Sequence, residues 1–403
     1  MSKYKIVNLG DIAAVILGKK FISSEFNNKS GIPVIKVNNI QDNYVDLTDC
    51  DFVESPLGNI NKRYQVYPGD LLISLSGSHI NQPKSVVGKV AMYNDPETCL
   101  LNQRVAKIKP DEKLVNRFYL KAYLSQASIR QQLAFISKGA SNQANISPKD
   151  VKKIQIKLPP FEVQQRIGNT LETIDQLLNN NSDRIAGYEA IADHLFQHYF
   201  GPYQSPNQFN SGKNDYLPAG WRISNLANVA HINKERIGKN FVGVIKYIDL
   251  SSVSKGKIGL ITELDYKNAP AKAKLIVHKD DIIWSLIRPD REAYARIKEN
   301  EKNLIVSNGF VTISPSIIPA NYLYQFLRSK RFITYLNNKT LQSVVPYLTV
   351  KTFENAEIIL PDEQTLNTFE TLIDPINAII FNLNQQNRLL YEAQKAFIKL
   401  SLP

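Results

Sequence analysis

LPPFEVQQRIGNTLETIDQLL, residues 158–178, has a near copy in LPDEQTLNTFETLIDPINAII, residues 360–380. In both stretches an apolar, strand-like run closes at Leu-Pro, and a helical pattern that carries the dipeptide Ile-Asp follows at once. Because the same junction of strand and helix recurs about half a chain length later, the sequence indicates an internal duplication.

The similarity between the two halves extends well beyond this junction. Five further pairs follow in one order: YKIVNLGDIA (4–13) with WRISNLANVA (221–230), VIKVNNI (34–40) with VIKYIDL (244–250), YPGDLLIS (67–74) with HKDDIIWS (278–285), Asn102 with Asn308, and FYLKAYLSQ (118–126) with NYLYQFLRS (321–329). The separation between partners shortens along the chain while their order stays fixed. This behaviour is typical of a duplicated domain with insertions and deletions in its loops, and not of a short-period solenoid.

Each half mixes short β-branched runs with helical patterns. Strands are predicted at residues 32–37, 70–74, 244–248 and 281–284, and helices at residues 115–133 and 322–336. The sequence therefore predicts an α+β (mixed α/β) fold for each globular domain.

The repeat divides the chain into two globular domains, two long helices and a linker. In chain order, we predict a domain at 1–157, a helix at 158–200, a linker at 201–220, a domain at 221–359 and a helix at 360–403. The linker is rich in Pro, Gly, Ser and Asn and poor in branched apolar residues, as surface connections are. A chain of 403 residues also exceeds one compact core and fits about two domains.

Both long helices carry an apolar stripe with alternating steps of four and three residues. The stripe comprises Ile167, Leu171, Ile174, Leu178, Asn181, Ile185, Tyr188, Ala192, Leu195 and Tyr199 in the first helix, and Leu366, Phe369, Ile373, Ile376, Ile380, Leu383, Asn387, Leu390 and Phe397 in the second. Such heptads are typical of coiled coils. Each helix could instead pack on its own domain, but two long apolar stripes in one chain favour a mutual antiparallel coiled coil.

Several residues interrupt the ideal helical pattern. Asn181 and Asn387 would fix the register of the helix pair at some cost in stability. Pro375 should remove a hydrogen bond and bend the second helix near Asp374, and the run Asn179-Asn180-Asn181 is a poor helix former.

The length of the first helix bears on how far apart its ends lie. A helix from Glu162 to Tyr199 spans roughly 57 Å at about 1.5 Å per residue. Domains held at its two ends would reach DNA about one turn or more apart, one turn being roughly 34 Å.

Composition narrows the class of protein. No apolar run approaches the roughly 20 residues of a membrane helix, and the start MSKYKIVNLGDI lacks the layout of a signal peptide, so we expect a cytoplasmic protein without membrane contact. With only two cysteines, a disulfide framework or a cysteine-rich zinc site is excluded. Lys and Arg outnumber Asp and Glu by 49 to 37, and the net charge of +12 favours a polyanionic partner if the charge collects on one face.

Signatures of catalysis and of cofactor binding are missing from the sequence. There is no GxxxxGK[ST] phosphate loop and no Gly-rich turn of the kind that holds S-adenosylmethionine or NAD. Pro159-Pro160 is not part of an Asn-Pro-Pro-Tyr-like motif, which could bind an adenine that is flipped out of the DNA helix. We therefore expect no catalytic residues, no metal and no cofactor in this chain.

Two residue sets compete with that expectation. His194 and His198 lie four residues apart on one helical face, but without an evident third ligand they are better read as solvated or packed histidines. Asp249, Asp265 and Lys267 have the residue types of a Mg²⁺-dependent nuclease, although such spacing arises easily by chance.

Polar and basic loops lie at matching places in the two halves, at residues 74–85, 137–147, 285–296 and 341–349. Arg, Lys, Asn and Gln read base edges, while Ser, Thr and backbone N–H groups hold phosphates. The candidate DNA-contacting residues are Ser76, Ser78, His79, Gln82, Lys84, Lys138, Ser141, Asn142, Gln143, Asn145, Arg288, Arg291, Arg296, Gln342, Ser343, Tyr347 and Thr349.

These residues carry a resemblance to a known family. The chain resembles the specificity subunits of type I restriction-modification systems, through LPAGWRISNLANVA at the start of the second half, YPGDLLIS, DDIIWSLIRP, SKGASNQANIS leading into IQIKLPPFEVQQRI, and the helix end LFQHYF. These features keep the family order from Tyr4 to about Leu400. The second junction departs from the family pattern locally. Asp362-Glu363 stand where the first junction has the four residues 160–163, and Pro375 lies inside the helix that follows.

The resemblance implies two target-recognition domains related by a pseudo-twofold repeat, with the long helices as an antiparallel coiled-coil spacer. Each domain would read one half of a split, asymmetric sequence in double-stranded DNA. Two modification methyltransferase subunits, which would hold S-adenosylmethionine and methylate adenine, and restriction (motor) subunits would be separate chains. A self-contained Mg²⁺-dependent endonuclease and a coiled-coil protein scaffold are the alternative functions.

Overall fold

The computed structural model describes residues 4–27, 30–42, 44–47, 50–54, 56, 60–78, 87–136, 143–201, 217–238 and 240–403. The chain forms two compact units, one from Met1–Asn179 with Arg388–Pro403 (unit 1) and one from Asn180–Asn387 (unit 2). Two long helices, α5 (Phe161–Phe200) and α11 (Glu363–Ser401), contribute to both. Each unit therefore combines one globular domain with a segment of each long helix.

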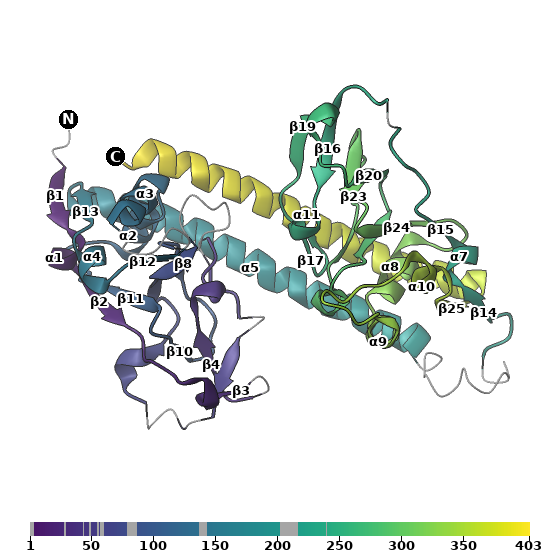
Figure 1. Ribbon diagram of the computed structural model, residues 1–403, viewed down its shortest axis with the longest axis horizontal. Helices are drawn as coiled ribbons and strands as arrows, with labels where there is room; N and C mark the ends of the chain where they lie inside the picture. The colour runs from purple at the N-terminus through teal and green to yellow at the C-terminus, as the bar shows by residue number, and fades with distance from the viewer. Residues whose placement is uncertain are drawn as a thin grey trace. The chain divides into compact units, whose positions relative to one another are not determined.

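The domain of unit 1 contains two main sheets, a strand pair at the chain start, and a second, short pair formed by β8 (Ser76–Ser78) and β12 (Gln143–Asn145) (Figure 1). One sheet has the order β2-β11-β7-β9 and is antiparallel; its strands are Ala13–Leu17, Val105–Pro110, Leu71–Ser74 and Val90–Met92. The other has the order β3-β5-β4-β10-β6, with strands Phe26–Asn27, Asp51–Val53, Ile32–Ile35, Cys99–Leu101 and Gln65–Val66, and its β4–β10 pair is parallel. The strand pair joins β1 (Lys5–Asn8) to β13 (Gln155–Leu158), so the chain start closes on the strand that precedes α5.

The domain of unit 2 repeats this topology, except that its second main sheet has four strands where that of unit 1 has five. Its sheet β15-β24-β21-β22 comprises Ala230–Ile232, Phe310–Pro315, Ile282–Ser285 and Tyr294–Arg296. Its sheet β19-β16-β23-β20 comprises Thr262–Asp265, Val244–Ile248, Leu304–Ser307 and Ala273–Ile276, and the β16–β23 pair is again parallel. Strand β14 (Arg222–Asn225) pairs with β25 (Glu357–Leu360), as β1 pairs with β13. The predicted duplication and the α+β class are confirmed.

The strand registers correct two of the residue matches between the halves that the sequence predicted. Val105 lies opposite Ser74, and Phe310 lies opposite Ser285, so Asn102 corresponds to Ser307 and not to Asn308. In the parallel pairs, Ile35 lies opposite Leu101 and Ile248 opposite Val306, which shifts the match of 34–40 with 244–250 by about three residues. Similar apolar letters recur along adjacent positions of a buried strand, so letter matching alone does not fix its register.

Short helices connect and cover the sheets. They are α1 (Leu9–Ile12), α2 (Arg117–Leu124), α3 (Ala127–Ile136) and α4 (Pro148–Lys152) in unit 1, and α7 (Leu226–Val229), α8 (Ala320–Leu327), α9 (Lys330–Lys339) and α10 (Val350–Glu354) in unit 2. The single helices predicted at 115–133 and 322–336 are wrong, because each region forms two helices. In unit 2 the break falls at Ser329, whose side chain accepts a hydrogen bond from the Phe332 amide and caps α9.

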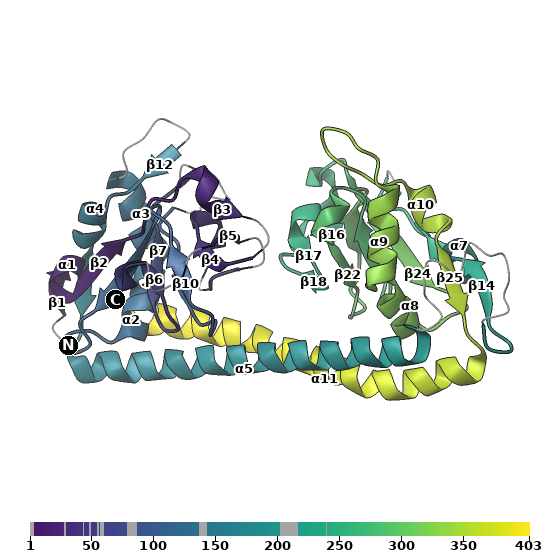
Figure 2. The ribbon, with the colours of Figure 1, turned by 90° about the horizontal axis from the view of Figure 1, so that it is seen from below.

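Ends of the long helices belong to the domain cores. In unit 2, Ala192, Phe196 and Phe200 of α5 and Phe369 of α11 are buried with Tyr322 of α8. Figure 2 shows α8 between the strands of this domain and the two helix ends. In unit 1, Ile167 and Leu171 of α5 join the domain core, and Phe397 of α11 packs against it. Part of the apolar stripe therefore packs on a domain, as the alternative interpretation of the stripe proposed.

The remaining stripe residues of unit 2 join the two helices to each other. Ile185 of α5 is buried with Ile380 and Leu383 of α11. Asn181 Nδ2 donates to Asn387 Oδ1 at 3.0 Å, and the Asn181 residue is 6% exposed. Since later positions of α5 meet earlier positions of α11, these segments run antiparallel.

The predicted helix breakers, the predicted linker and the expected lack of a membrane helix are compared with the structure in turn. Helix α5 continues through Asn179–Asn181, and α11 continues through Pro375, so neither feature ends its helix. Most of the predicted linker, at 202–216, lies outside the described residues. Within the described part of the chain, no helix combines the length and apolarity needed to cross a membrane.

Candidate nucleic-acid interface

Two of the polar segments singled out in the first half meet in unit 1. Strand β8 (Ser76–Ser78) pairs antiparallel with β12 (Gln143–Asn145), which places Ser76 opposite Asn145. The Ile146 amide also donates to the Leu75 carbonyl at 2.8 Å. The segment after β7 and the segment before α4 are thus joined into one surface element.

The candidate DNA-contacting residues of unit 1 differ in burial and in hydrogen bonding, and some lie outside the described residues. The Ser76 residue is only 6% exposed, so little of it is accessible to a ligand in this structure. Asn145 accepts a hydrogen bond on Oδ1 from Arg104 Nη1 at 3.1 Å. The backbones of Ser78 and Gln143 lie in the strand pair. The candidates outside the described residues are His79, Gln82, Lys84, Lys138, Ser141 and Asn142.

Arg104 is a basic residue of this surface that sequence reasoning missed. Its side chain is exposed, its amide donates to Asn102 Oδ1 at 3.2 Å, and its carbonyl accepts from the Leu75 amide at 2.9 Å. These bonds place a guanidinium beside the joined segments. The available signal was the polar run Asn102-Gln103-Arg104 between two buried strands, of which only Asn102 entered the repeat matches.

The corresponding segments of the second half meet in unit 2. Tyr347 forms isolated β-bridges with both Ile287 and Leu341. The Leu348 amide donates to the Leu286 carbonyl at 2.8 Å, and the Arg288 amide donates to the Pro346 carbonyl at 2.9 Å. As in unit 1, the segment after a central strand joins the segment before a short helix. The described parts of the four loops predicted from the sequence therefore form two equivalent pairs.

Arg288 stands at a tight turn of this surface. Its φ of 50° and the φ of 47° at Glu292 place both residues in the left-handed region, at the two ends of the 3₁₀ helix η8 (Pro289–Arg291). Such a backbone is costly for residues other than glycine and persists where the surroundings hold it. Arg288 and Arg291 are both exposed. A surface hollow of ≈ 410 Å³ is bordered by Arg288, Pro289, Asp290, Asn337, Thr340, Gln342 and Pro346.

The other predicted residues of the loop at 341–349 are also on the surface. Gln342, Ser343, Tyr347 and Thr349 are exposed. The Ser343 hydroxyl donates to the Val345 carbonyl, and the Thr349 and Thr352 hydroxyls lie 3.1 Å apart. With Arg288 and Arg291, this surface offers two guanidinium groups, an amide and several hydroxyls to a ligand.

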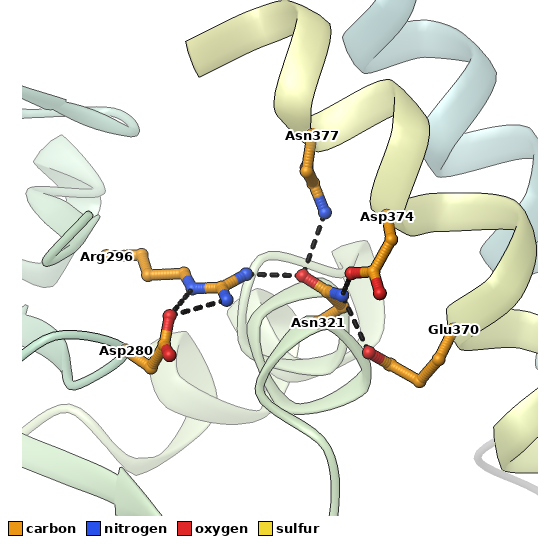
Figure 3. Close-up of polar contacts among 6 residues, drawn as sticks. All are labelled: Asp280, Arg296, Asn321, Glu370, Asp374 and Asn377. Atoms are coloured by element: carbon orange, nitrogen blue, oxygen red, sulfur yellow. Dashed lines mark hydrogen bonds and ion pairs between the residues drawn. The ribbon is translucent and has the colours of Figure 1, made fainter. Parts of the chain in front are cut away.

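Arg296 lies in a different environment (Figure 3). Its Nε and Nη2 donate to Asp280 Oδ1 at 3.1 and 2.7 Å, and its Nη1 donates to Asn321 Oδ1. The Asn321 amide in turn donates to Glu370 and Asp374 of α11, at 2.6 Å each. All donors of Arg296 that face this cluster are used within the protein. These bonds connect β22 to Asn321 and, through it, to α11 within unit 2. The assignment of Arg296 as a DNA contact stays a prediction, with less support than that of the exposed Arg288 and Arg291.

Burial also affects the carboxylates of this cluster. Desolvation raises the pKa of Glu370, and the neighbouring Asp374 charge raises it further, against the lowering effect of the hydrogen bond from Asn321. The cluster thus depends on donors from Asn321 to keep two neighbouring acids in place.

Unit 1 has an equivalent anchor. Lys121 Nζ of α2 lies 2.6 Å from Asp175 Oδ2 of α5, and Gln394 Nε2 of α11 donates to Asp175 Oδ1 at 2.7 Å. Asp175 and Asp374 are the aspartates of the repeated Ile-Asp dipeptide. The recurring dipeptide therefore marks the carboxylate that ties each domain to the long helices, a role the sequence did not reveal.

The residues of the rival nuclease set have structural roles. Asp249 caps η6 (Leu250–Ser252) and pairs with Lys272; burial would raise the pKa of Asp249, but hydrogen bonds from Lys272 and the Ser251 amide outweigh it and hold the value at about 2. Asp265 accepts from the Lys267 amide at 3.1 Å and caps η7 (Tyr266–Asn268). Both carboxylates are thus occupied in capping short helices.

Within the described ranges, no group of three or more His, Cys, Asp or Glu residues could hold a metal ion. His194 and His198 are exposed, and the His198 ring contacts the Tyr199 ring edge-on at 5.4 Å between centroids.

Two copies of one α+β domain, each presenting a joined pair of polar loops, define a two-domain recognition protein. The chain matches the family model described as "Type I restriction modification DNA specificity domain" over residues 1–186 and 218–387. It belongs to this family and is a type I restriction-modification specificity subunit, the non-catalytic DNA-recognition component. The endonuclease and scaffold alternatives are not supported.

Individual relatives agree with this assignment. The putative type I restriction enzyme MjaX specificity subunit of Methanocaldococcus jannaschii is 24% identical over 429 residues, which cover 99% of this chain and 92% of the relative. The EcoBI specificity subunit of Escherichia coli is 23% identical and covers 94% and 80%. The crystal structure of an S subunit from M. genitalium superposes with a TM-score of 0.54 at 12% identity, covering 100% and 96%, which supports the fold.

Proposed function

We propose that each domain reads one half of a bipartite, asymmetric sequence in double-stranded DNA. The observation that carries this proposal is the pair of joined polar loops, present once in each domain at equivalent places in the fold. Lys and Arg side chains supply the salt-sensitive attraction to phosphates, consistent with the net charge of +12, and a few loop side chains choose bases. The residues with the best geometry are Arg104 and Asn145 in unit 1 and Arg288, Arg291 and Gln342 in unit 2.

In this proposal the long helices form an antiparallel coiled-coil spacer that sets the gap between the half-sites. Its support comes from contacts within each unit. In unit 2 the Asn181–Asn387 hydrogen bond and the burial of Ile185 join the helices. In unit 1 Gln394 and Asp175 join them. The polar pair at Asn181 also supports a defined register, because an amide pair loses its bond when the helices slip.

The chain directs partner subunits to the chosen sequence. We propose two modification methyltransferase subunits, which hold S-adenosylmethionine and methylate adenine, and restriction (motor) subunits as separate chains. Apolar side chains exposed on the long helices support protein docking there: Leu177 and Ile191 on α5, and Leu372, Leu389 and Tyr391 on α11.

Mapping of methylated adenines tests this function. Genomic DNA from cells with and without the gene should differ in adenine methylation at one sequence that consists of two short parts and a fixed gap. The absence of any gene-dependent motif in cells that also carry the methyltransferase partner would contradict the proposal.

Removing one exposed arginine should weaken the reading of one half-site only. Arg104→Ala should reduce affinity by about 1–3 kcal/mol through the half-site of unit 1, and Arg288→Ala by a similar amount through that of unit 2, as expected for one base contact. Competition binding with duplexes altered in one half-site measures which half has lost discrimination.

Arg222→Ala is the matched control for these arginine variants. Arg222 is an exposed arginine on β14, in the same domain as Arg288 but outside its loop pair. We expect its affinity to remain near that of the natural chain. Equal losses in all three variants would indicate a diffuse charge effect in place of two local reading surfaces.

A change in helix length should alter the gap and not the half-sites. Insertion of one heptad into each long helix adds roughly 10 Å, about three base pairs of DNA, because each helical residue adds about 1.5 Å. Methylation mapping should then return both half-sites with a longer gap. An unaltered gap would refute the spacer model.

A further inference from the structure

The loop pair of unit 2 carries an apolar patch that the proposed contacts to phosphates and polar base edges do not explain. Its members are exposed side chains on the two joined segments: Ile287, Leu341, Val344, Val345 and Tyr347. Val344 is 100% exposed at the tip of its loop. Single exposed apolar residues are common on protein surfaces, but a group of five on one small element marks an interaction surface.

The backbone holds this tip in a defined shape. Below it, the Leu341 amide donates to the Tyr347 carbonyl at 2.9 Å, and the Tyr347 amide donates to the Leu341 carbonyl at 3.2 Å. Pro346, beside the tip, accepts from the Arg288 amide at 2.9 Å. Since both ends of the loop are tied, the fully exposed valine needs little ordering when it meets a partner.

The neighbouring groups point to DNA as that partner. Gln342 precedes the tip and borders the same hollow as Arg288, and Arg291 is exposed on the adjoining 3₁₀ helix. Guanidinium and amide groups match phosphates and base edges. Within the major groove, the apolar feature that distinguishes one base pair from the others is the 5-methyl group of thymine.

The side chain itself favours a methyl contact over insertion between bases. Valine is short and stiff at χ1, whereas the side chains that wedge base pairs apart are mostly longer or aromatic. We propose that Val344, supported by Val345, contacts the 5-methyl group of a thymine in the half-site read by unit 2. This assignment rests on the proposed function and adds the chemical identity of one recognised group.

Uracil substitution tests the contact, because deoxyuridine lacks only the methyl group of thymidine. The full chain is assembled with its methyltransferase partners, and binding is measured to duplexes in which each thymine of that half-site is replaced in turn by deoxyuridine. Replacement at one of these positions should weaken binding about four-fold, as expected when about one buried methyl group is removed. In Val344→Ala the same replacement should change binding less than two-fold, while Val344→Thr should retain most of the discrimination.

Val242→Ala is the control, since Val242 is an exposed valine of the same domain that precedes β16 and lies outside the loop pair. It should keep the full uracil effect. Selective binding with no uracil effect at any position, or an equal uracil effect in Val344→Ala, would overturn the thymine contact while leaving the proposed function standing. Failure of the natural complex to select any duplex would instead refute the proposed function and, with it, the contact.

Discussion

Asp175→Ala lowers the free energy of unfolding of unit 1 by about 3–5 kcal/mol, the largest electrostatic effect that we expect in this protein. The side chains of Lys121 and Asp175 are 8% and 14% exposed, and their charges lie 2.6 Å apart. Removal of the carboxylate leaves the Lys121 ammonium group buried without its counter-charge and removes the acceptor of Gln394. Thermal unfolding, with hydrogen exchange of α2 as a local probe, measures the loss.

A double replacement distinguishes this mechanism from a general packing defect. Lys121→Met combined with Asp175→Leu removes both charges and keeps apolar volume, so it should recover most of the stability lost in Asp175→Ala. If the double variant is as unstable as the single one, the buried charge is not the cause of the loss.

Phe369→Ala should destabilise unit 2 by about 3–5 kcal/mol, because it leaves a cavity in a fully buried aromatic cluster. Phe369 of α11 packs on Phe196 and Phe200 of α5, at ring-centroid distances of 6.2 and 5.1 Å. Phe200 in turn packs on Tyr322 of α8 at 4.8 Å. The loss should appear in the amides of all three helices by hydrogen exchange, since one cluster joins them.

Leu372→Ala provides the matched control on the same helix. Leu372 is exposed, only three residues after Phe369, and its loss should cost less than about 0.5 kcal/mol. Similar losses at both positions would contradict the assignment of one face of α11 to the domain core.

Much of the fold was predictable from the sequence because the domain is duplicated, so each half supports the interpretation of the other. The matches at 4–13 with 221–230 and at 67–74 with 278–285 coincide with equivalent strands in the two domains. The matches that failed, at Asn102 and at 34–40, lie at the ends of the buried strands β10 and β4, where the neighbouring strand residues are apolar. There the register is decided by pairing with strands distant in the sequence, which no local pattern contains.

The candidate site was predictable as a set of loops and less so as a set of residues. Composition identified four polar segments, and the fold joined them in pairs. The fold also brought Arg104 to this surface and directed Arg296 toward acceptors within unit 2, because the direction of each guanidinium depends on acceptors supplied by other elements. Asp280 and Asn321 hold Arg296 inside unit 2, whereas Asn145 and Asn102 position Arg104 at the surface.

The sequence by itself determined the duplication, the α+β class and the two long helices, since each follows from the order and periodicity of residues along the chain, and its motifs carry the resemblance to DNA specificity subunits. Only the tertiary structure decided which stripe residues face a domain and which face the other helix, and which carboxylate anchors each domain. The junction at residues 158–178 illustrates the difference. Its pattern predicts a strand followed by a helix. The role of Asp175 as an anchor of the domain depends on Lys121 and Gln394, which the fold brings to it from distant parts of the chain.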